Sequence, residues 1–308
     1  MKTSTVSIGK ELSDCIQQLR FTLERRIQLI DAVIAVLVQH VSAKHIRPED
    51  TPISEEIRGA LPLMLQAIGA SSNTLVQLSD SPGLQTRDCY SIARSIIELA
   101  INICYLTAEG PAAAERALRH ACQKSFQDLE RESKIGENTI RLVCGGRPDP
   151  DTVPGLKEDL AEFTSRAGRE KGWVDESVDG RISVAGARFG NPLVTKLHFA
   201  RFMVYRHSSE ILHGTLFSAM YFFGLTMPRR QYTQQDAEEY IGQQHMMLLM
   251  AAGLALDAVV EAFHLAYGFQ WAYDRGKKLT ESLARIPFLA SNTKTDEDPG
   301  SPTQRGDV

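Results

Sequence analysis

The sequence lacks a paired cysteine motif, an excess of either charge and an apolar leader. Its 34 lysines and arginines stand against 38 aspartates and glutamates, so the global charge does not indicate a nucleic acid or an anionic membrane as a partner. The five cysteines are widely spaced and include no Cys-x-x-Cys pair, which favours reduced thiols in a reducing compartment. Because residues 1–10 are polar and carry no secretory signal, we expect a cytoplasmic protein.

The sequence also lacks motifs that would identify a catalysed reaction. The Gly145-Gly146 pair has no preceding strand pattern and no following lysine, so we interpret it as a turn rather than a phosphate-binding loop. No Ser-His-Asp or Cys-His arrangement can be paired from spacing. The most apolar segment, 246–268, contains two acidic residues and a histidine, which are costly in hydrocarbon. We therefore expect it to be a buried helix, and we expect no membrane partner.

What the sequence does contain is helical periodicity in a chain of ordinary globular composition. Hydrophobic residues make up 43% and charged residues 23%, which favours a folded globule over a disordered chain. Near the N-terminus, apolar residues recur in steps of three and four, a bundle pattern: Leu12, Ile16, Leu19, Leu23, Ile27, Ile30, Ile34, Leu37 and Val41. We predict an all-α fold, a multi-helix bundle of long antiparallel helices in a single domain, 1–290.

Capping and breaking residues place the predicted helices. A long N-terminal helix occupies 1–45, and Ser54 is positioned to cap the second helix, in which Pro62 predicts a bend or an interruption. Pro111 opens the fourth helix from its first turn. The intervening helices are predicted at 54–79, 86–108, 111–134, 155–169 and 193–224.

The C-terminal part is predicted to hold two more helices and a tail. Thr233 and Asp236 have the spacing of a capping box and open the C-terminal helices, 233–290. Residues 171–192 lose the helical period, so we expect an irregular insertion there, and we expect no strand anywhere in the chain. The tail, 291–308, is polar and rich in Ser, Thr, Asp, Pro and Gly, which predicts disorder.

Two predicted helices each carry a polar stripe among apolar residues. In the third helix the stripe recurs every three or four residues, at Arg94, Glu98, Asn102 and Tyr105. A helix that is apolar around most of its circumference is normally buried, so we expect this stripe inside the bundle or against a cavity, with Arg94 and Glu98 paired at the (i, i+4) spacing.

The helix from residue 193 repeats the arrangement with Tyr205, Ser209 and His213 four apart, and with Arg206 and Glu210 also four apart. If the two helices are neighbours, the two stripes would form one internal hydrogen-bonded cluster. A purely structural network is an equally good interpretation, because satisfied buried polar groups also specify helix register.

These residues carry a resemblance. The segment from Ala93 to Glu98, the stretch 173–190 and the segment from Tyr205 to Gly214 resemble the bacterial helical family catalogued as domain of unknown function 5677. The signals are an Arg-x-x-x-Glu on one helix and a Tyr-x-x-x-Ser-x-x-x-His-Gly on another, and the likeness covers 54–225. The resemblance implies a helical core and supplies no activity.

A looser resemblance connects Arg206 and His213 with the HEPN-type helical ribonucleases, whose Arg-x(4 to 6)-His spacing they satisfy. It implies metal-independent RNA cleavage without a cofactor, in which the histidine handles the 2′-hydroxyl proton and the arginine steadies the phosphorane, often across a dimer. We assign Arg206, His213 and Glu210 as catalytic, with RNA as the partner, a homodimer as the assembly and a toxin or phage-defence role. The supporting polar cluster comprises Arg94, Glu98, Asn102, Tyr105, Tyr205, Ser209 and His207.

The sequence is also compatible with two other functions. Glu210 with His213, and Glu261 with His264, form two Glu-x-x-His units, the pattern of four-helix di-metal carboxylate proteins; Glu98 could add a ligand, but no fourth carboxylate can be assigned. The second alternative is a non-enzymatic helical binding or assembly module, in which the stripes only fix helix pairing.

Overall fold

The fold is a bundle of ten α-helices with one small hairpin, counted over the residues that the computed structural model describes: 9–38, 53–226 and 233–283. The prediction of an all-α bundle is confirmed. The helices are α1 (Lys10–Val38), α2 (Glu55–Leu78), α3 (Thr86–Glu109), α4 (Pro111–Asp128), α5 (Leu156–Glu162), α6 (Val178–Phe189), α7 (Asn191–Leu212), α8 (Leu216–Phe222), α9 (Gln234–Tyr267) and α10 (Gln270–Leu283). A single 3₁₀ turn, Pro150–Thr152, precedes α5.

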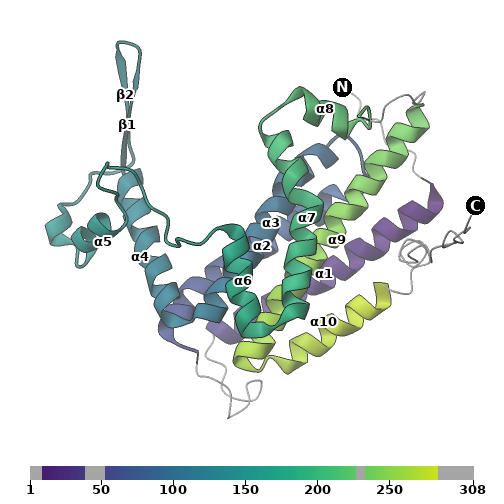
Figure 1. Cartoon of the computed structure of the whole chain (residues 1–308), viewed down its shortest axis with the longest axis horizontal. Helices are drawn as coiled ribbons and strands as arrows, with labels where there is room; N and C mark the ends of the chain where they lie inside the picture. The colour runs from purple at the N-terminus through teal and green to yellow at the C-terminus, as the bar shows by residue number, and fades with distance from the viewer. Residues whose placement is uncertain (1–8, 39–52, 227–232, 284–308) are drawn as a thin grey trace, which may run out of the picture.

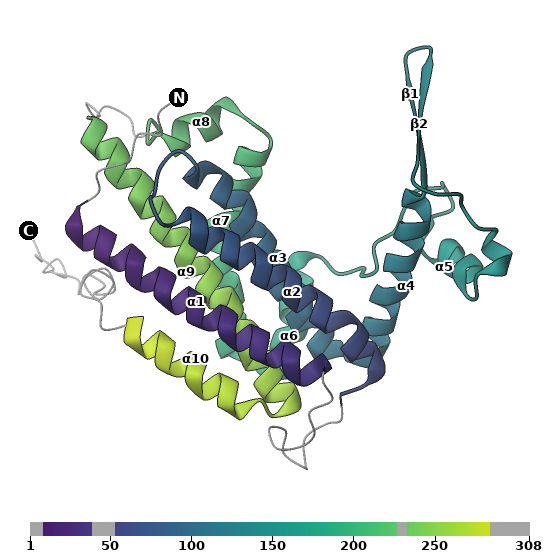
Figure 2. The ribbon, with the colours of Figure 1, turned by 180° about the vertical axis from the view of Figure 1, so that it is seen from behind.

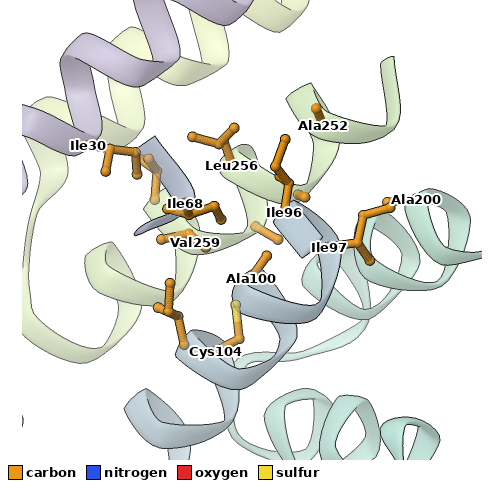
Figure 3. Packing of buried hydrophobic residues seen from close by; sticks show 14 of the residues in the cluster. Ile30, Ile68, Ile96, Ile97, Ala100, Cys104, Ala200, Ala252, Leu256 and Val259 are labelled. Carbon is orange, nitrogen blue, oxygen red and sulfur yellow. The ribbon is translucent and has the colours of Figure 1, made fainter. Parts of the chain in front are cut away.

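Helix α9 lies at the centre of the bundle and packs against α1, α3, α7 and α10 (Figure 1). Its small residues let neighbouring helices approach, and Ala252 and Leu256 are fully buried. Figure 3 shows these side chains beside Ile30 of α1, Ile68 of α2 and Ile96 of α3. The core is therefore built where four long helices bring their apolar stripes together.

Two of the described helices, α3 and α9, are long and apolar enough to cross a membrane by length and composition alone. Of their most apolar 18-residue windows, 61% and 78% of residues are buried inside the bundle. In α9 the burial follows from contacts on several sides, because α1, α3, α7 and α10 surround it. The expectation that 246–268 forms a buried helix agrees with this packing.

The predicted caps are confirmed. The Ser54 hydroxyl accepts a hydrogen bond from the Ile57 amide at 3.4 Å, and Pro111 stands in the first turn of α4. Thr233 and Asp236 form a reciprocal capping box at the start of α9. Ser54 and the capping box satisfy backbone donors at a helix start, whereas Pro111 removes one donor that would be unpaired; all three act within one turn, which is why sequence alone locates them.

The prediction that the chain has no strand is wrong. Helix α4 ends at Asp128 rather than near residue 134, and an antiparallel hairpin follows, β1 (Glu130–Ile135) with β2 (Asn138–Val143). Gly136 in the two-residue turn has φ +62°, a conformation that glycine adopts without strain. The hairpin projects away from the helices beyond the end of α4 (Figures 1 and 2).

Three other boundaries differ from the prediction. The insertion at 171–192 contains α6, whose buried Ile182, Ala185 and Phe189 keep helical spacing although two glycines interrupt the pattern. The helix predicted to reach residue 224 ends at Leu212, because Gly214 (φ +62°) breaks it before α8. Helix α2 runs on through Pro62, and α5 ends at Glu162 rather than 169. The predicted tail, 291–308, lies outside the described residues, as do 39–45 and 284–290.

Candidate functional site

The α3 stripe begins with the predicted ion pair, in which Arg94 Nε lies 2.9 Å from Glu98 Oε1. The two side chains are 30% and 43% exposed, so the expectation that this pair is sealed inside the bundle is wrong. Arg94 and Glu98 therefore lie at the edge of the hydrophobic core. The fully buried residues of α3, such as Ile96 and Ile97, lie on other faces of the helix.

The remaining residues of the α3 stripe bind α6 and the segment before it, not α7. Asn102 Oδ1 accepts a hydrogen bond from the Arg181 guanidinium of α6. The buried Tyr105 donates its hydroxyl to Glu176 at 3.1 Å, and its ring contacts the edge of Trp173 with centroids 5.8 Å apart. The side chains that continue the stripe thus fix the position of α6.

Tyr205 is the residue of the α7 stripe that joins the two stripes. Its ring lies under two guanidinium groups, with the ring centroid 5.0 Å from Arg94 Cζ and 5.2 Å from Arg201 Cζ. Burial raises the pKa of Tyr205, and the neighbouring Glu98 carboxylate raises it further. The phenol therefore stays protonated at neutral pH and packs the α3–α7 contact.

Arg206 and His213 lie on the solvent side of α7. They are seven residues apart, a spacing that returns to the same helix face after about two turns, and both side chains are exposed. No ion pair joins Arg206 to Glu210 among the described residues, despite their (i, i+4) spacing. His213 forms the C-cap of α7, and its amide donates to the Ser209 carbonyl at 3.1 Å.

Glu210 and His207 hold the junction between α7 and α8. Glu210 Oε2 accepts a hydrogen bond from the Thr215 hydroxyl at 2.8 Å, and Thr215 also caps α8. His207 stacks on Tyr221 of α8 with ring centroids 3.8 Å apart and planes 6° apart. Burial lowers the pKa of His207, and the positive charge of Arg206 lowers it further. Both side chains thus join α7 to the start of α8 or to α8 itself.

Sequence reasoning missed the surroundings of His213. Arg87, in the first turn of α3, donates from Nη2 to the Ile211 carbonyl at 3.4 Å, which brings a second guanidinium to the end of α7. No periodicity signals this contact, because 124 residues separate the two partners. The large apolar residues exposed on α7, on α8 and just after it are Phe199, Phe202, Leu212, Leu216, Phe217, Met220, Phe223 and Leu225.

The most deeply buried ion pair was not predicted either. Arg26 of α1 makes two hydrogen bonds to Asp257 of α9, at 2.7 and 2.9 Å, and the side chains are 2% and 5% exposed. Thr280 of α10 bonds to both partners. Beside the pair lies a cavity of about 120 Å³ lined by Lys196, Asp257, Val260, Tyr273, Gly276, Lys277 and Thr280.

A second buried network surrounds His245 of α9, which is fully buried. Its Nδ1 lies 3.1 Å from the Thr86 hydroxyl and its Nε2 2.5 Å from the Ser79 hydroxyl. Burial, together with the positive charge of Arg20, lowers the pKa of His245 to about 4. The imidazole is therefore neutral at pH 7 and links α9 to the α2–α3 connection.

The two Glu-x-x-His units do not converge. Glu261 forms an ion pair with Lys196 at 2.6 Å, and the His264 ring stacks on Tyr273 with centroids 4.6 Å apart. His213 is exposed at the far end of α7. Among the described residues, no three His, Cys, Asp or Glu side chains gather as a metal-binding group. The di-metal alternative thus gains no support from these donors.

Comparisons of the chain with protein-family models, with curated proteins and with solved structures found no match. The resemblances to the domain of unknown function 5677 family and to the HEPN-type ribonucleases therefore stay predictions that rest on the quoted residues.

Proposed function

We propose that the protein cleaves RNA without a metal ion at the C-terminal end of α7, with Arg206 and His213 as the catalytic residues. The observation that supports this best is that both side chains are exposed on one helix face and neither is paired with a carboxylate among the described residues. A guanidinium and an imidazole without such partners can both turn to a phosphodiester, which an internal polar network could not do.

The proposed chemistry is an attack of the ribose 2′ oxygen on phosphorus, with departure of the 5′ oxygen. His213 accepts the proton of the 2′-hydroxyl, and Arg206 stabilises the negative charge that builds on the phosphoryl oxygens. The product is a 2′,3′-cyclic phosphate, and the 5′ oxygen takes its proton from water. Glu210 acts as a positioning residue, because its bond to Thr215 fixes the turn that carries His213.

The same helix face offers a contact for a single-stranded substrate. Phe202 is 80% exposed and precedes Arg206 by four residues, so the aromatic ring and the guanidinium are neighbours on the surface of α7. An exposed aromatic ring beside a cation suits an unpaired base and the phosphate next to it. Arg87 of α3 reaches the end of α7 through its bond to the Ile211 carbonyl, and its charge is shared with Asp88, 3.4 Å away.

The test is cleavage of mixed cellular RNA in the presence of a chelator by the parent protein, Arg206→Ala and His213→Gln. We expect the His213→Gln protein to fold and to lose roughly 10²-fold or more of the activity. His198→Gln is the matched control, because His198 is an exposed histidine on the same helix, outside the Arg206 to His213 segment. If the parent leaves RNA intact over a range of pH and concentration, or if both variants cut as well as the parent, the proposal is wrong.

A second candidate is a non-enzymatic assembly module, which the exposed apolar residues of α7 and α8 favour. Phe202 and Leu216 are 80% and 77% exposed, and such residues gathered on adjacent elements mark protein contact sites when they form a patch. This alternative predicts a homo-oligomer that Phe202→Ser with Leu216→Ser dissociates, measured by light scattering, together with no RNA cleavage by the parent. Cleavage of RNA by the parent protein would instead favour the ribonuclease.

A further inference from the structure

The hairpin of β1 and β2 is exposed on both faces and projects from the molecule without a covering element (Figures 1 and 2). Ile135, Ile140 and Leu142 are 60%, 56% and 50% exposed. A lone two-stranded hairpin is at best marginally stable in water, and further strands stabilise it. Both strand edges are also unpaired within the described residues, since the sheet holds only these two strands.

The register shows which backbone groups are free. Ile135 pairs with Asn138 across a two-residue turn, so this closing pair exchanges its hydrogen bonds within the hairpin. Ser133, two residues earlier, does the same with Ile140. The alternating residues Glu132 and Lys134 then direct their N–H and C=O groups away from β2, to the open edge of β1.

The charges on that edge are self-complementary. We propose that a second copy of this chain pairs with the first along β1, antiparallel and centred on Ser133, to form a four-stranded sheet. Glu132 of each copy then stands opposite Lys134 of the other, twice in the interface, and the same residues supply the free backbone groups. Neither Glu132 nor Lys134 has an ion-pair partner among the described residues, whereas Glu130 is taken by Arg141 at 2.5 Å.

Other registers are worse. Centring the pairing on Glu132 or on Lys134 places that charge against its own copy, and like charges directly opposite destabilise a sheet. If the register between the two copies shifts by one residue, the apolar side chains of one hairpin lie on the same side of the sheet as the charged side chains of the other. The second edge, β2, has no acidic residue to oppose its Arg141. Antiparallel pairing also sends the two helical bodies to opposite ends of the sheet, because each hairpin projects from its own body.

The first test uses charge reversal and analytical ultracentrifugation over a concentration series. Glu132→Lys and Lys134→Glu each place like charges opposite one another, and we expect each to weaken dimerisation at least 10-fold. The double variant restores opposite charges between the copies and is expected to dimerise more tightly than either single variant, although position 132 then repels Arg141 within its own hairpin. Glu158→Lys is the control, since it makes the same charge change at an exposed residue of α5. A parent that stays monomeric, or a double variant as weak as the single ones, overturns the proposal.

The second test traps the centre of the interface. In this register Ser133 faces Ser133 of the second copy in a pair without mutual hydrogen bonds, where the Cα atoms lie close enough for a disulfide. We expect Ser133→Cys, with the exposed Cys122 and Cys144 replaced by serine, to form a disulfide dimer under mild oxidation. Ile140→Cys, on the other strand of the same cross-strand pair, should still dimerise but should form no disulfide between the two copies. If Ile140→Cys cross-links and Ser133→Cys does not, or if only a change of Phe202 abolishes dimerisation, the two copies do not meet along β1 and the proposal is wrong.

Discussion

Two ion pairs of this molecule use the same side-chain chemistry in opposite surroundings. Arg26 and Asp257 join α1 to α9 across 231 residues and are 2% and 5% exposed. Arg94 and Glu98 are four residues apart on α3 and are 30% and 43% exposed. The first pair is held by helix packing, and the second needs only its own helix. The (i, i+4) spacing of Arg94 and Glu98 thus allows their pair to form within one helix, but it does not indicate whether the pair is buried.

Packing explains how the bundle tolerates the buried pair. The Arg26 guanidinium lies against α9 at Gly253, where a Cβ would lie 3.8 Å from Nη1, an ordinary van der Waals distance. Asp257 accepts two of its hydrogen bonds, and Thr280 adds one from α10. Buried charges are stable only when geometry and hydrogen bonds compensate for lost hydration, and three helices together meet that requirement here.

The largest expected effect comes from breaking this pair. Asp257→Ala leaves the Arg26 guanidinium buried without its counter-charge, and we expect a loss of about 3–5 kcal/mol in the free energy of unfolding. Urea unfolding followed by circular dichroism measures it. The double variant Arg26→Met with Asp257→Leu should lose less than Asp257→Ala, because no unpaired charge remains. If the double variant is the less stable one, the pair contributes more than its desolvation removes, and this account of the core is wrong.

The buried His245 gives an intermediate effect that depends on pH. Its pKa falls from the ordinary 6.5 to about 4 on folding, so between these values the unfolded chain binds more protons. Stability is therefore expected to fall as the pH is lowered from 6.5 to 4, by about 3 kcal/mol at most for this group. His245→Gln, which removes the titrating group, should flatten this part of the pH profile of unfolding free energy. His198→Gln, at an exposed position, should leave the slope unchanged; equal slopes in parent and His245→Gln would contradict the assignment.

The sequence predicted those features that arise within one or two helical turns. Ser54, Pro111 and the Thr233–Asp236 box act locally, and the Arg94–Glu98 pair follows from its spacing. Stripes of apolar residues were enough for the all-α bundle, because a helix must bury such a stripe.

What the sequence did not yield depends on contacts between distant segments or on weak local patterns. The Arg26–Asp257 pair and the Arg87 contact join residues far apart in the chain. Strand β1 was missed because its charged residues 130–134 were predicted as the end of the fourth helix, and β2 was missed because a single short strand gives only a weak local pattern. Helix α6 was missed because Gly180 and Gly186 lower its helix propensity, although Gly186 lies against Val194, where a Cβ would be 2.3 Å from Cγ2.

The smallest expected effect concerns Glu98, the carboxylate of the exposed ion pair. If this pair were sealed in the bundle, Glu98→Ala would cost on the order of 3 kcal/mol, as breaking a buried pair does. Because both side chains reach solvent, water screens the attraction and rehydrates Arg94 when its partner is removed, so we expect a loss below about 1 kcal/mol. Arg94 also keeps its contact with the Tyr205 ring, 5.0 Å from the centroid, which holds α3 against α7 without the carboxylate. Urea unfolding of Glu98→Ala beside Glu24→Ala, a change at an exposed residue of α1 with no ion pair in the described part of the chain, measures the difference. A loss as large as that of Asp257→Ala would show that the two pairs have equivalent surroundings, and the polar stripe of α3 would then belong to the core.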